Sequence, residues 1–342
     1  MFTSCKSRIS TQTSLRNGAS ILALCLLASA PAVAKAAITT FDVSGAISTA
    51  GESINDGNTV AGTYVDGSYV SRGFVRTPDG TITTFAPKGA TATYQLSINS
   101  DGVIAGLWEN GQSIPVRHGF VRSTDGKITT FDPKGSTNTQ TFGINSGGTV
   151  TGYYEDGSSN YYGFVRDPDG TITTIDLPGA IYTESFGIND NGDIAGWYLA
   201  TNGKQSGFIR TADGTVTAFK PPGAKTTQPA AIAAYDSITG TFIDSNEFAH
   251  GFVRDRDGTI KKFDPKTSLA TSPVSINAEG QIAGTYQASN GNYGFIRGSS
   301  GTIRTFTILK SNATEVLGGS AQSITGYYVD GSGMIHGFIR TP

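Results

Sequence analysis

Beyond residue 36, the chain alternates short apolar segments with turn residues. Segments such as 171–175 (Thr-Ile-Thr-Thr-Ile) and 194–198 (Ile-Ala-Gly-Trp-Tyr) are rich in β-branched and aromatic residues, and Gly, Pro, Asn and Asp separate them. This pattern is typical of β-strands joined by tight turns. No segment of this part shows the long 3.6-residue apolar period of an amphipathic helix. The pattern therefore predicts an all-β chain.

The string Gly-Phe-Val/Ile-Arg recurs along the chain and defines an internal repeat. Its copies begin 43 to 46 residues apart, at Gly73, Gly119, Gly163, Gly207, Gly251, Gly294 and Gly337. In the fourth copy we expect four strands, named A (185–189), B (193–198), C (207–210) and D (215–219). Four antiparallel strands in about 44 residues are typical of a β-propeller blade.

The turns between these strands carry their own signals. Asp167-Pro168-Asp169-Gly170 joins C to D in the third copy, with Pro fixing a type I bend and Gly taking the left-handed position after it. Asp190-Asn191-Gly192 joins A to B in the fourth copy. Antiparallel order then puts the A–B and C–D turns on one face of a propeller and the B–C and D–A loops on the other.

The two ends of the repeat region complement each other. The last copy stops at 337–342 without a D strand, whereas 38–42 (Ile-Thr-Thr-Phe-Asp) has the pattern of a D strand with no preceding blade. Joining them completes a seventh blade and leaves no unpaired edge. We therefore predict one seven-bladed β-propeller domain over 37–342, with four antiparallel strands per blade, closed by the N-terminal strand. A linear β-solenoid, the structural alternative, would have no use for complementary half-units at its ends.

The first 36 residues have the pattern of a secretory signal peptide. Lys6, Arg8 and Arg16 precede the apolar run 19–30, and small residues follow it, so we expect cleavage after Ala34 or Ala36. The run is too short for a spanning helix, which needs about 20 apolar residues. Leu24 before Cys25 disfavours lipidation. We therefore expect a secreted or periplasmic protein with no membrane span.

Charge and cysteine content limit the classes of binding partner and of chemistry that we expect. Cleavage after Ala34 removes both cysteines and three of the 25 basic residues, which leaves 22 against 27 acidic ones, a net charge of −5. A surface without basic surplus does not favour nucleic acid. The mature chain has no disulfide or cysteine nucleophile, and we expect a monomer.

Three tripeptides carry a family resemblance. His118-Gly119-Phe120 and its equivalents at His250 and His336, together with the Ile-Asn-x-x-Gly element that begins at Ile188, resemble the bacterial HAF-type extracellular repeat family. This chain departs from the family pattern in having Gly for Ala, and in replacing His in the remaining copies by Arg72, Tyr162, Ser206 and Tyr293. The resemblance covers the whole mature chain and implies export and a propeller shape, but no reaction.

Residues that recur in every copy are interpreted as structural residues, and the aromatic ones as packing between blades. The set comprises one aromatic residue on strand B, the strand C phenylalanine and the arginine that ends strand C. For these arginines we expect ion pairs or carbonyl contacts that brace the C–D turn beside aspartates such as Asp79 and Asp169. The three histidines occupy equivalent positions in blades two, five and seven, too far apart to share a metal ion. We predict no metal site and no cofactor.

Loops of variable length point to the functional face. The copies differ in length only in the B–C and D–A loops, and the longest B–C loop, 109–118 in copy two, has two extra residues. Loops on a rigid scaffold are where binding residues usually lie. The candidate binding residues on this face, with Glu184 nearer the axis, are Asp66, Tyr69, Asn110, Asp156, Tyr161, Tyr162, Glu184, Asp244, Phe248, Tyr293 and Asp330.

Three functions follow from this reasoning. Tyrosines beside carboxylates and amides suit a sugar, whose ring face stacks while its hydroxyls form hydrogen bonds, and they also suit a protein surface. The first hypothesis is therefore a non-catalytic, lectin- or adhesin-like module that binds a glycan or a surface protein. The second is an enzyme such as a polysaccharide lyase or glycosidase, for which Glu184, Glu155 and Asp156 are the candidate carboxylates. The third is a structural scaffold.

Overall fold

The regular structure of the described part of the chain consists of β-strands alone. The computed structural model describes residues 36–112, 115–308 and 311–341. Within these ranges none of the chain forms a helix with the length and apolar composition needed to cross a bilayer. The predicted signal peptide, apart from Ala36, lies outside the described residues.

The strands follow the repeat, and all four predicted positions are occupied in each copy. The A strands are β2 (Ser48–Ile54), β6 (Ala90–Ile98), β10 (Ser136–Ile144), β14 (Ala180–Ile188), β18 (Ala224–Ile232), β22 (Ala270–Ile276) and β26 (Ala313–Gly319). The B strands are β3 (Val60–Val65), β7 (Ile104–Asn110), β11 (Val150–Asp156), β15 (Ile194–Ala200), β19 (Ile238–Asp244), β23 (Ile282–Ala288) and β27 (Ile324–Val329). The C strands are β4 (Ser71–Arg76), β8 (Arg117–Arg122), β12 (Tyr161–Arg166), β16 (Gln205–Arg210), β20 (Ala249–Arg254), β24 (Gly291–Arg297) and β28 (Ile335–Arg340). The D strands are β5 (Ile82–Phe85), β9 (Ile128–Phe131), β13 (Ile172–Ile175), β17 (Val216–Phe219), β21 (Ile260–Phe263), β25 (Ile303–Phe306) and the N-terminal β1 (Ile38–Phe41).

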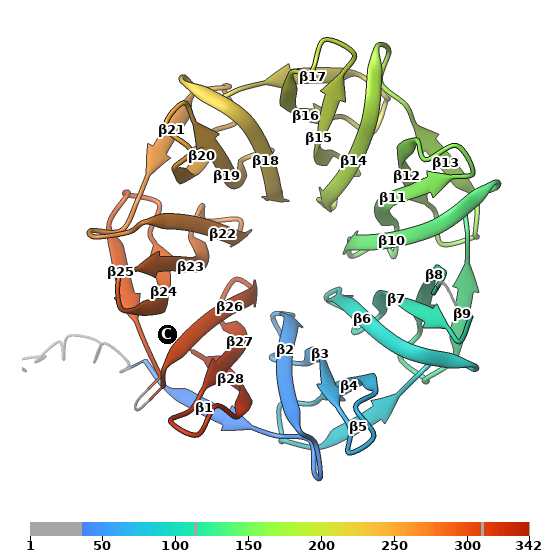
Figure 1. Cartoon of the computed structure of the whole chain (residues 1–342), viewed down its shortest axis with the longest axis vertical. Coiled ribbons are helices and arrows are strands. Elements are labelled where there is room, and N and C mark those ends of the chain that lie inside the picture. Colours follow the sequence, from blue (N-terminus) through green and yellow to red (C-terminus); the bar gives the residue numbers. More distant parts are fainter. Residues whose placement is uncertain (1–35, 113–114, 309–310, 342) are drawn as a thin grey trace, which may run out of the picture. The chain divides into compact units, whose positions relative to one another are not determined.

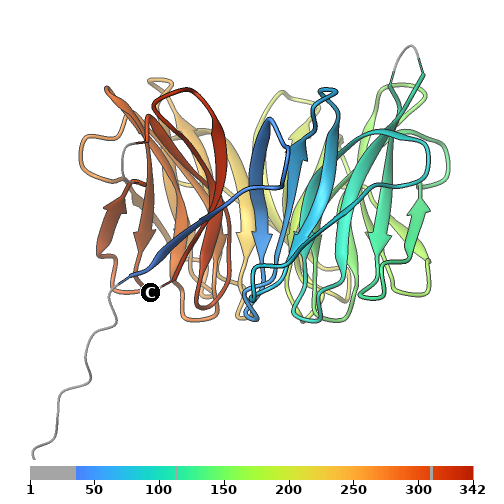
Figure 2. The ribbon, with the colours of Figure 1, turned by 90° about the horizontal axis from the view of Figure 1, so that it is seen from below.

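The strands of each copy pair in antiparallel order from A to D. In copy four, for example, β14 pairs with β15, β15 with β16 and β16 with β17. Figure 1 shows the copies arranged around a common centre, with the A strands innermost and the D strands outermost. Figure 2 shows the strands running between two faces with turns at both. The B–C and D–A loops thus share one face, here called the loop face.

The A strands extend further than predicted. In copy four, β14 begins at Ala180 rather than at residue 185 and shifts register between Ala180 and Tyr182 and between Ser185 and Gly187. These β-bulges interrupt the alternation of apolar and polar positions, so the pattern hides the first half of the strand. The corresponding bulge in copy three turns a backbone carbonyl toward strand B, where a Cβ on Gly152 would lie 1.9 Å from the oxygen of Gln140.

The N-terminal strand pairs with the last strand of the chain. β1 lies antiparallel to β28, with Ile38 opposite Arg340 and Phe41 opposite Gly337. The Asp42 carboxylate accepts a hydrogen bond from His336 Nδ1 at 2.9 Å. The predicted D-strand role of 38–42 is therefore observed in this pairing.

Adjacent copies are held together by stacked phenylalanines, as expected for these recurring residues, and by an arginine that lies on the same rings, which was not expected. Phe74 and its strand C equivalents are fully buried, and most meet the strand D phenylalanine of the preceding copy edge to face, as Phe131 meets Phe164 at 5.9 Å. Arg166 lies over the same Phe131 ring, 4.9 Å from its centroid. The packing interpretation of the strand C phenylalanines is confirmed.

Of the two contacts expected for the recurring arginines, ion pairs or carbonyl contacts, the structure shows the second. Each of Arg76, Arg122, Arg166, Arg210, Arg254 and Arg297 donates to the carbonyl of the next residue. Among the described residues none of them forms an ion pair with a turn aspartate. Asp79 and Asp169 instead accept backbone N–H groups of their own turns. The arginine stacks on the neighbouring copy because an aromatic face attracts a guanidinium.

The asparagine of the Ile-Asn element has two functions. Asn99 Oδ1 accepts the N–H of Val103 at 2.9 Å, which closes the A–B turn. Its Nδ2 donates at 3.0 Å to the carbonyl of Asn145, the equivalent residue of the next copy. Asn55, Asn145 and Asn189 repeat both bonds. The motif therefore links neighbouring copies near the centre of the propeller.

Candidate functional site

The polar candidates at the start of each B–C loop are held by their own loops. In every case Oδ1 accepts backbone N–H groups two and four or six residues later, an arrangement that closes a tight turn. The residues are Asp66, Asn110, Asp156, Asp244 and Asp330. The structure places them on the loop face but in separate copies, and it does not bring them together.

The aromatic candidates divide into three groups. Tyr162 and Tyr293 stack on the strand B tyrosines Tyr154 and Tyr286, with ring centroids 5.4 and 5.5 Å apart, so they occupy the packing position of the histidines. Tyr69 and Phe248 stand at the tips of different loops with 82% and 52% of their surface exposed. Tyr161 alone belongs to a larger aromatic cluster.

A pocket on the loop face lies between copies two and three. Its volume is about 300 Å³, and it is lined by Glu109, Pro115, Arg117, Asn138, Gln140, Tyr153, Glu155 and Tyr161. Glu109 and Arg117 flank the longest B–C loop, and the other side of the pocket comes from β10, β11 and β12 of copy three. The length variation seen in the sequence therefore coincides with a cavity.

The aromatic side of the pocket continues into copy four. Tyr153 stacks on Phe142 at 5.6 Å and lies 5.8 Å from Tyr161, whose ring meets Tyr182 edge to face at 4.9 Å. Phe186 packs against Phe142 at 4.5 Å. Five aromatic rings from two adjacent copies thus form one wall, which fixes the orientation of the two tyrosines that line the pocket.

The polar side of the pocket is a short chain of hydrogen bonds. Arg117 Nε donates to Glu109 Oε1 at 3.1 Å, and the Arg117 backbone N–H donates to Asn138 Oδ1 at 3.2 Å. Asn138 Nδ2 donates in turn to Glu155 Oε2 at 3.0 Å. Within the described residues no hydrogen bond engages the amide of Gln140 or the hydroxyl of Tyr153. These contacts fix the orientation of the polar side chains that line the cavity.

Glu184 lies next to this pocket rather than in its lining. Burial raises the pKa of its carboxyl to about 7. Burial and then the charge of Glu184 raise the pKa of the Tyr153 hydroxyl, and burial and the charge of Glu155 raise that of Tyr161. Both phenols are therefore neutral hydrogen-bonding groups at physiological pH.

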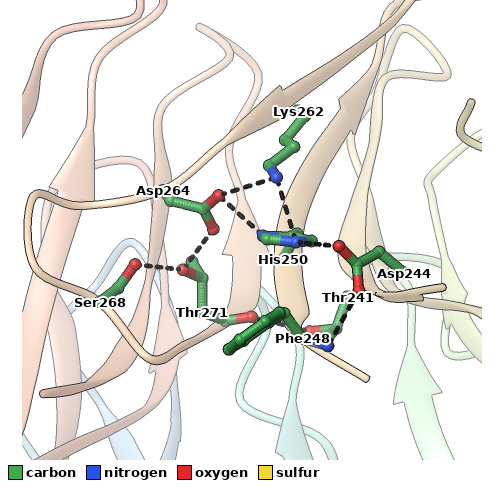
Figure 3. A network of polar contacts seen from close by, with 8 residues as sticks. All are labelled: Thr241, Asp244, Phe248, His250, Lys262, Asp264, Ser268 and Thr271. Atoms are coloured by element: carbon green, nitrogen blue, oxygen red, sulfur yellow. Dashed lines mark hydrogen bonds and ion pairs between the residues drawn. The ribbon is translucent and has the colours of Figure 1, made fainter. Parts of the chain in front are cut away.

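The histidines form a different network on the same face. Figure 3 shows His250 between two carboxylates, with Nδ1 2.9 Å from Asp264 Oδ2 and Nε2 3.3 Å from Asp244 Oδ2. Lys262 Nζ lies 3.0 Å from Nε2. Asp264 also accepts the hydroxyl of Thr271 at 2.7 Å. His118 and Asp132 repeat this arrangement with Thr139, and His336 pairs with Asp42, so the network is a structural link from strand C to the D–A loop.

The His336 link predicts a pH-dependent stability. Burial lowers the pKa of His336, but the hydrogen bonds and charges of Asp42 and Asp330 outweigh it and raise the pKa above 6.5. A raised folded-state pKa gives stability that is complete below pH 6.5 and is lost as the pH rises through the folded value. We expect no more than about 1 kcal/mol, because Asp42 is half exposed and water screens the pair.

Thermal unfolding between about pH 6 and pH 9 checks this expectation. The melting temperature of the wild type should fall across this window by more than that of His336→Gln, which removes the titrating group. Equal pH dependence in the two proteins would contradict the assignment.

Sequence reasoning missed part of the lining. Arg117, Asn138 and Tyr153 were not singled out, and Glu109 entered only as the start of the longest loop. The extra length of that loop was the one signal that could have found them. Within the described ranges no group of three or more His, Cys, Asp or Glu residues is placed to hold a metal ion.

Comparison with known proteins supports the fold. No protein-family model matches the chain, and no curated protein matches it. Solved structures do: TolB from Acinetobacter baumannii matches at 14% identity with a TM-score of 0.50, over 69% of this chain and 59% of that one. A prolyl endopeptidase matches at 11% identity with a TM-score of 0.60, over 83% of this chain and 47% of that one.

A puromycin hydrolase mutant matches at 11% identity with a TM-score of 0.58, over 86% of this chain and 55% of that one. The chain thus spans about half to three fifths of the length of the structures it matches. At these identities the likeness extends to the fold alone. Over the parts that match, the chain is similar to these proteins in having a β-propeller fold.

Proposed function

We propose that the protein is an exported, non-catalytic binding module whose pocket between copies two and three accepts a sugar residue of an extracellular glycan. The observation that carries this proposal is the cavity itself, where the longest B–C loop meets two oriented tyrosines. Tyrosine rings stack on the apolar face of a sugar, and the amide and carboxylate groups opposite them suit its hydroxyls.

The proposal includes a finer architecture and location. Seven sequence copies and the pairing of β1 with β28 support a seven-bladed propeller whose ring the N-terminal strand closes. The signal-like pattern of residues 1–36 supports export to the periplasm or the medium, where glycans are accessible.

A second candidate, a glycan-cleaving enzyme, is favoured by Glu184. A carboxyl with a pKa of about 7 retains its proton near neutral pH and has the acidity of a general acid. Glycosidases pair such an acid with a second carboxylate, and Glu155 of the pocket lining is the candidate for that role.

An array of glycans and polysaccharides tests both candidates with the mature protein, scored for binding and for turnover. Tyr161→Ala should weaken binding about tenfold, because the loss of stacking and buried area is worth about 1.4 kcal/mol. Tyr69→Ala is the matched control, since Tyr69 is an exposed tyrosine on the same face outside the pocket.

Equal effects of the two substitutions would place binding elsewhere. Turnover that Glu184→Gln abolishes would replace the binding module by the enzyme. A protein that binds nothing on the array and cleaves nothing would favour the structural scaffold.

A further inference from the structure

The charges of the pocket are unbalanced. Three charged side chains line it, and two of them, Arg117 and Glu109, form an ion pair with each other at 3.1 Å. Glu155 has no cationic partner within 4 Å among the described residues. One of its oxygens accepts the Asn138 amide, which is a neutral donor. The pocket therefore presents one carboxylate whose charge no basic residue neutralises.

The position of Glu155 places this charge beside aromatic surface. Glu155 is the last residue but one of β11 and is paired across the sheet with Tyr161 on one side and Asn138 on the other. Tyr153 is two residues earlier on the same strand and lines the same pocket. A carboxylate next to two tyrosine rings suits an ammonium group, which forms a charge-assisted hydrogen bond with the first and is attracted to the faces of the others.

The surroundings make an anionic sugar unfavourable. Arg117 is the only basic residue of the lining, and its Nε already donates to Glu109. The carboxylate of a uronic acid would therefore lie close to Glu155 with no unpaired basic side chain beside it. Like charges brought together in a partly buried site repel each other.

We propose that the pocket is selective for an amino sugar, with the ligand's ammonium group held by Glu155 between Tyr153 and Tyr161. This inference rests on the proposed glycan-binding function and names the substrate class of the same site. Glu155 is then the residue that determines specificity, while the tyrosines supply the stacking surface that any sugar requires.

The test compares three oligosaccharides of equal length on the mature protein: glucosamine with free amines, its N-acetylated counterpart, and a uronic acid. At about pH 6, where such an amine carries its proton, calorimetry should show the free-amine oligosaccharide binding about tenfold more tightly than the N-acetylated one. The uronic acid oligosaccharide should bind least. Glu155→Gln keeps the shape of the side chain and should reduce the tenfold preference to about one.

Glu247→Gln is the matched control. Glu247 is an exposed glutamate in the B–C loop of copy five, so this substitution removes one negative charge from the same face at a position outside the pocket. It should leave the tenfold preference in place. Preferential binding of the uronic acid, or a preference that survives Glu155→Gln, would overturn the inference.

The outcomes separate this inference from the function on which it rests. Binding of all three sugars with equal affinity, still lost in Tyr161→Ala, leaves the glycan module and rejects the charge selectivity. The absence of any sugar binding rejects the glycan module itself. Tighter binding of a lysine-containing peptide than of the amine sugar would reject the sugar as the ligand and indicate a protein partner.

Discussion

Phe41→Ala is expected to destabilise the propeller by about 3–5 kcal/mol, the range for removal of a buried phenylalanine. Only 8% of the Phe41 side chain is exposed, and its ring lies 5.8 Å from Phe74 and 5.2 Å from Arg76. The ring also fills the space above Gly337, where a Cβ would lie 2.5 Å from it. Phe41 therefore links the last strand of the chain to the first copy.

Thermal or urea unfolding of the mature protein measures this loss, which corresponds to a fall of roughly 5–15 °C in melting temperature. Thr40→Ala is the control on the same strand, since Thr40 is exposed and should change stability by no more than about 0.5 kcal/mol. Deleting residues 37–43 should have a larger effect and promote association, because β28 then presents an unpaired edge.

Similar stability of the deletion and the wild type would mean that the N-terminal strand does not complete the last blade. A Phe41→Ala effect no larger than that of Thr40→Ala would mean that strand pairing, rather than the aromatic contact, holds β1.

The architecture could be predicted from the sequence because the copies of the repeat can be compared with one another position by position. Turn residues and strand C phenylalanines recur at fixed spacing, so the strand order within a copy could be predicted. The incomplete last copy showed which strand the N-terminal segment would supply. Comparing the copies with one another does not, however, show which residues of neighbouring copies are in contact. It did not show that Arg166 stacks on Phe131 of the preceding copy, or that Asn99 reaches the backbone of the next one.

The candidate site was harder to predict for the same reason. The pocket forms where two different copies meet, and its lining is not shared by other junctions. Tyr161 and Tyr162 are adjacent in the sequence but point to opposite faces of β12, so one lines the pocket and the other packs on Tyr154. Asp156 illustrates a second limit, since turn-closing and ligand-binding aspartates have the same local sequence.

The asparagine link between copies predicts the second large effect. Asn99 is almost fully buried, and Asn99→Ala would leave the N–H of Val103 without its partner. It would also remove the donor from copy two to the carbonyl of Asn145, which keeps only the N–H of Gly148 from its own turn. Because a polar group left unpaired costs about 1–3 kcal/mol and the loss of a further hydrogen bond about 1 kcal/mol, we expect a loss of about 2–4 kcal/mol. Ser100→Ala, at the exposed neighbouring position, is the control and should be close to neutral.

Asn99→Asp separates the two bonds of this side chain. It keeps the oxygen that closes the A–B turn but replaces the donor by a carboxylate oxygen that faces the carbonyl of Asn145. Repulsion there should raise the pKa of the new carboxyl above its unfolded value, so the variant should be least stable above the folded pKa. As the pH falls, protonation restores a donor, and the gap to the wild type in melting temperature should be smaller at about pH 4 than at about pH 7. If Asn99→Asp instead matches the wild type at neutral pH while Asn99→Ala does not, turn closure alone explains the motif and the bond between copies contributes nothing.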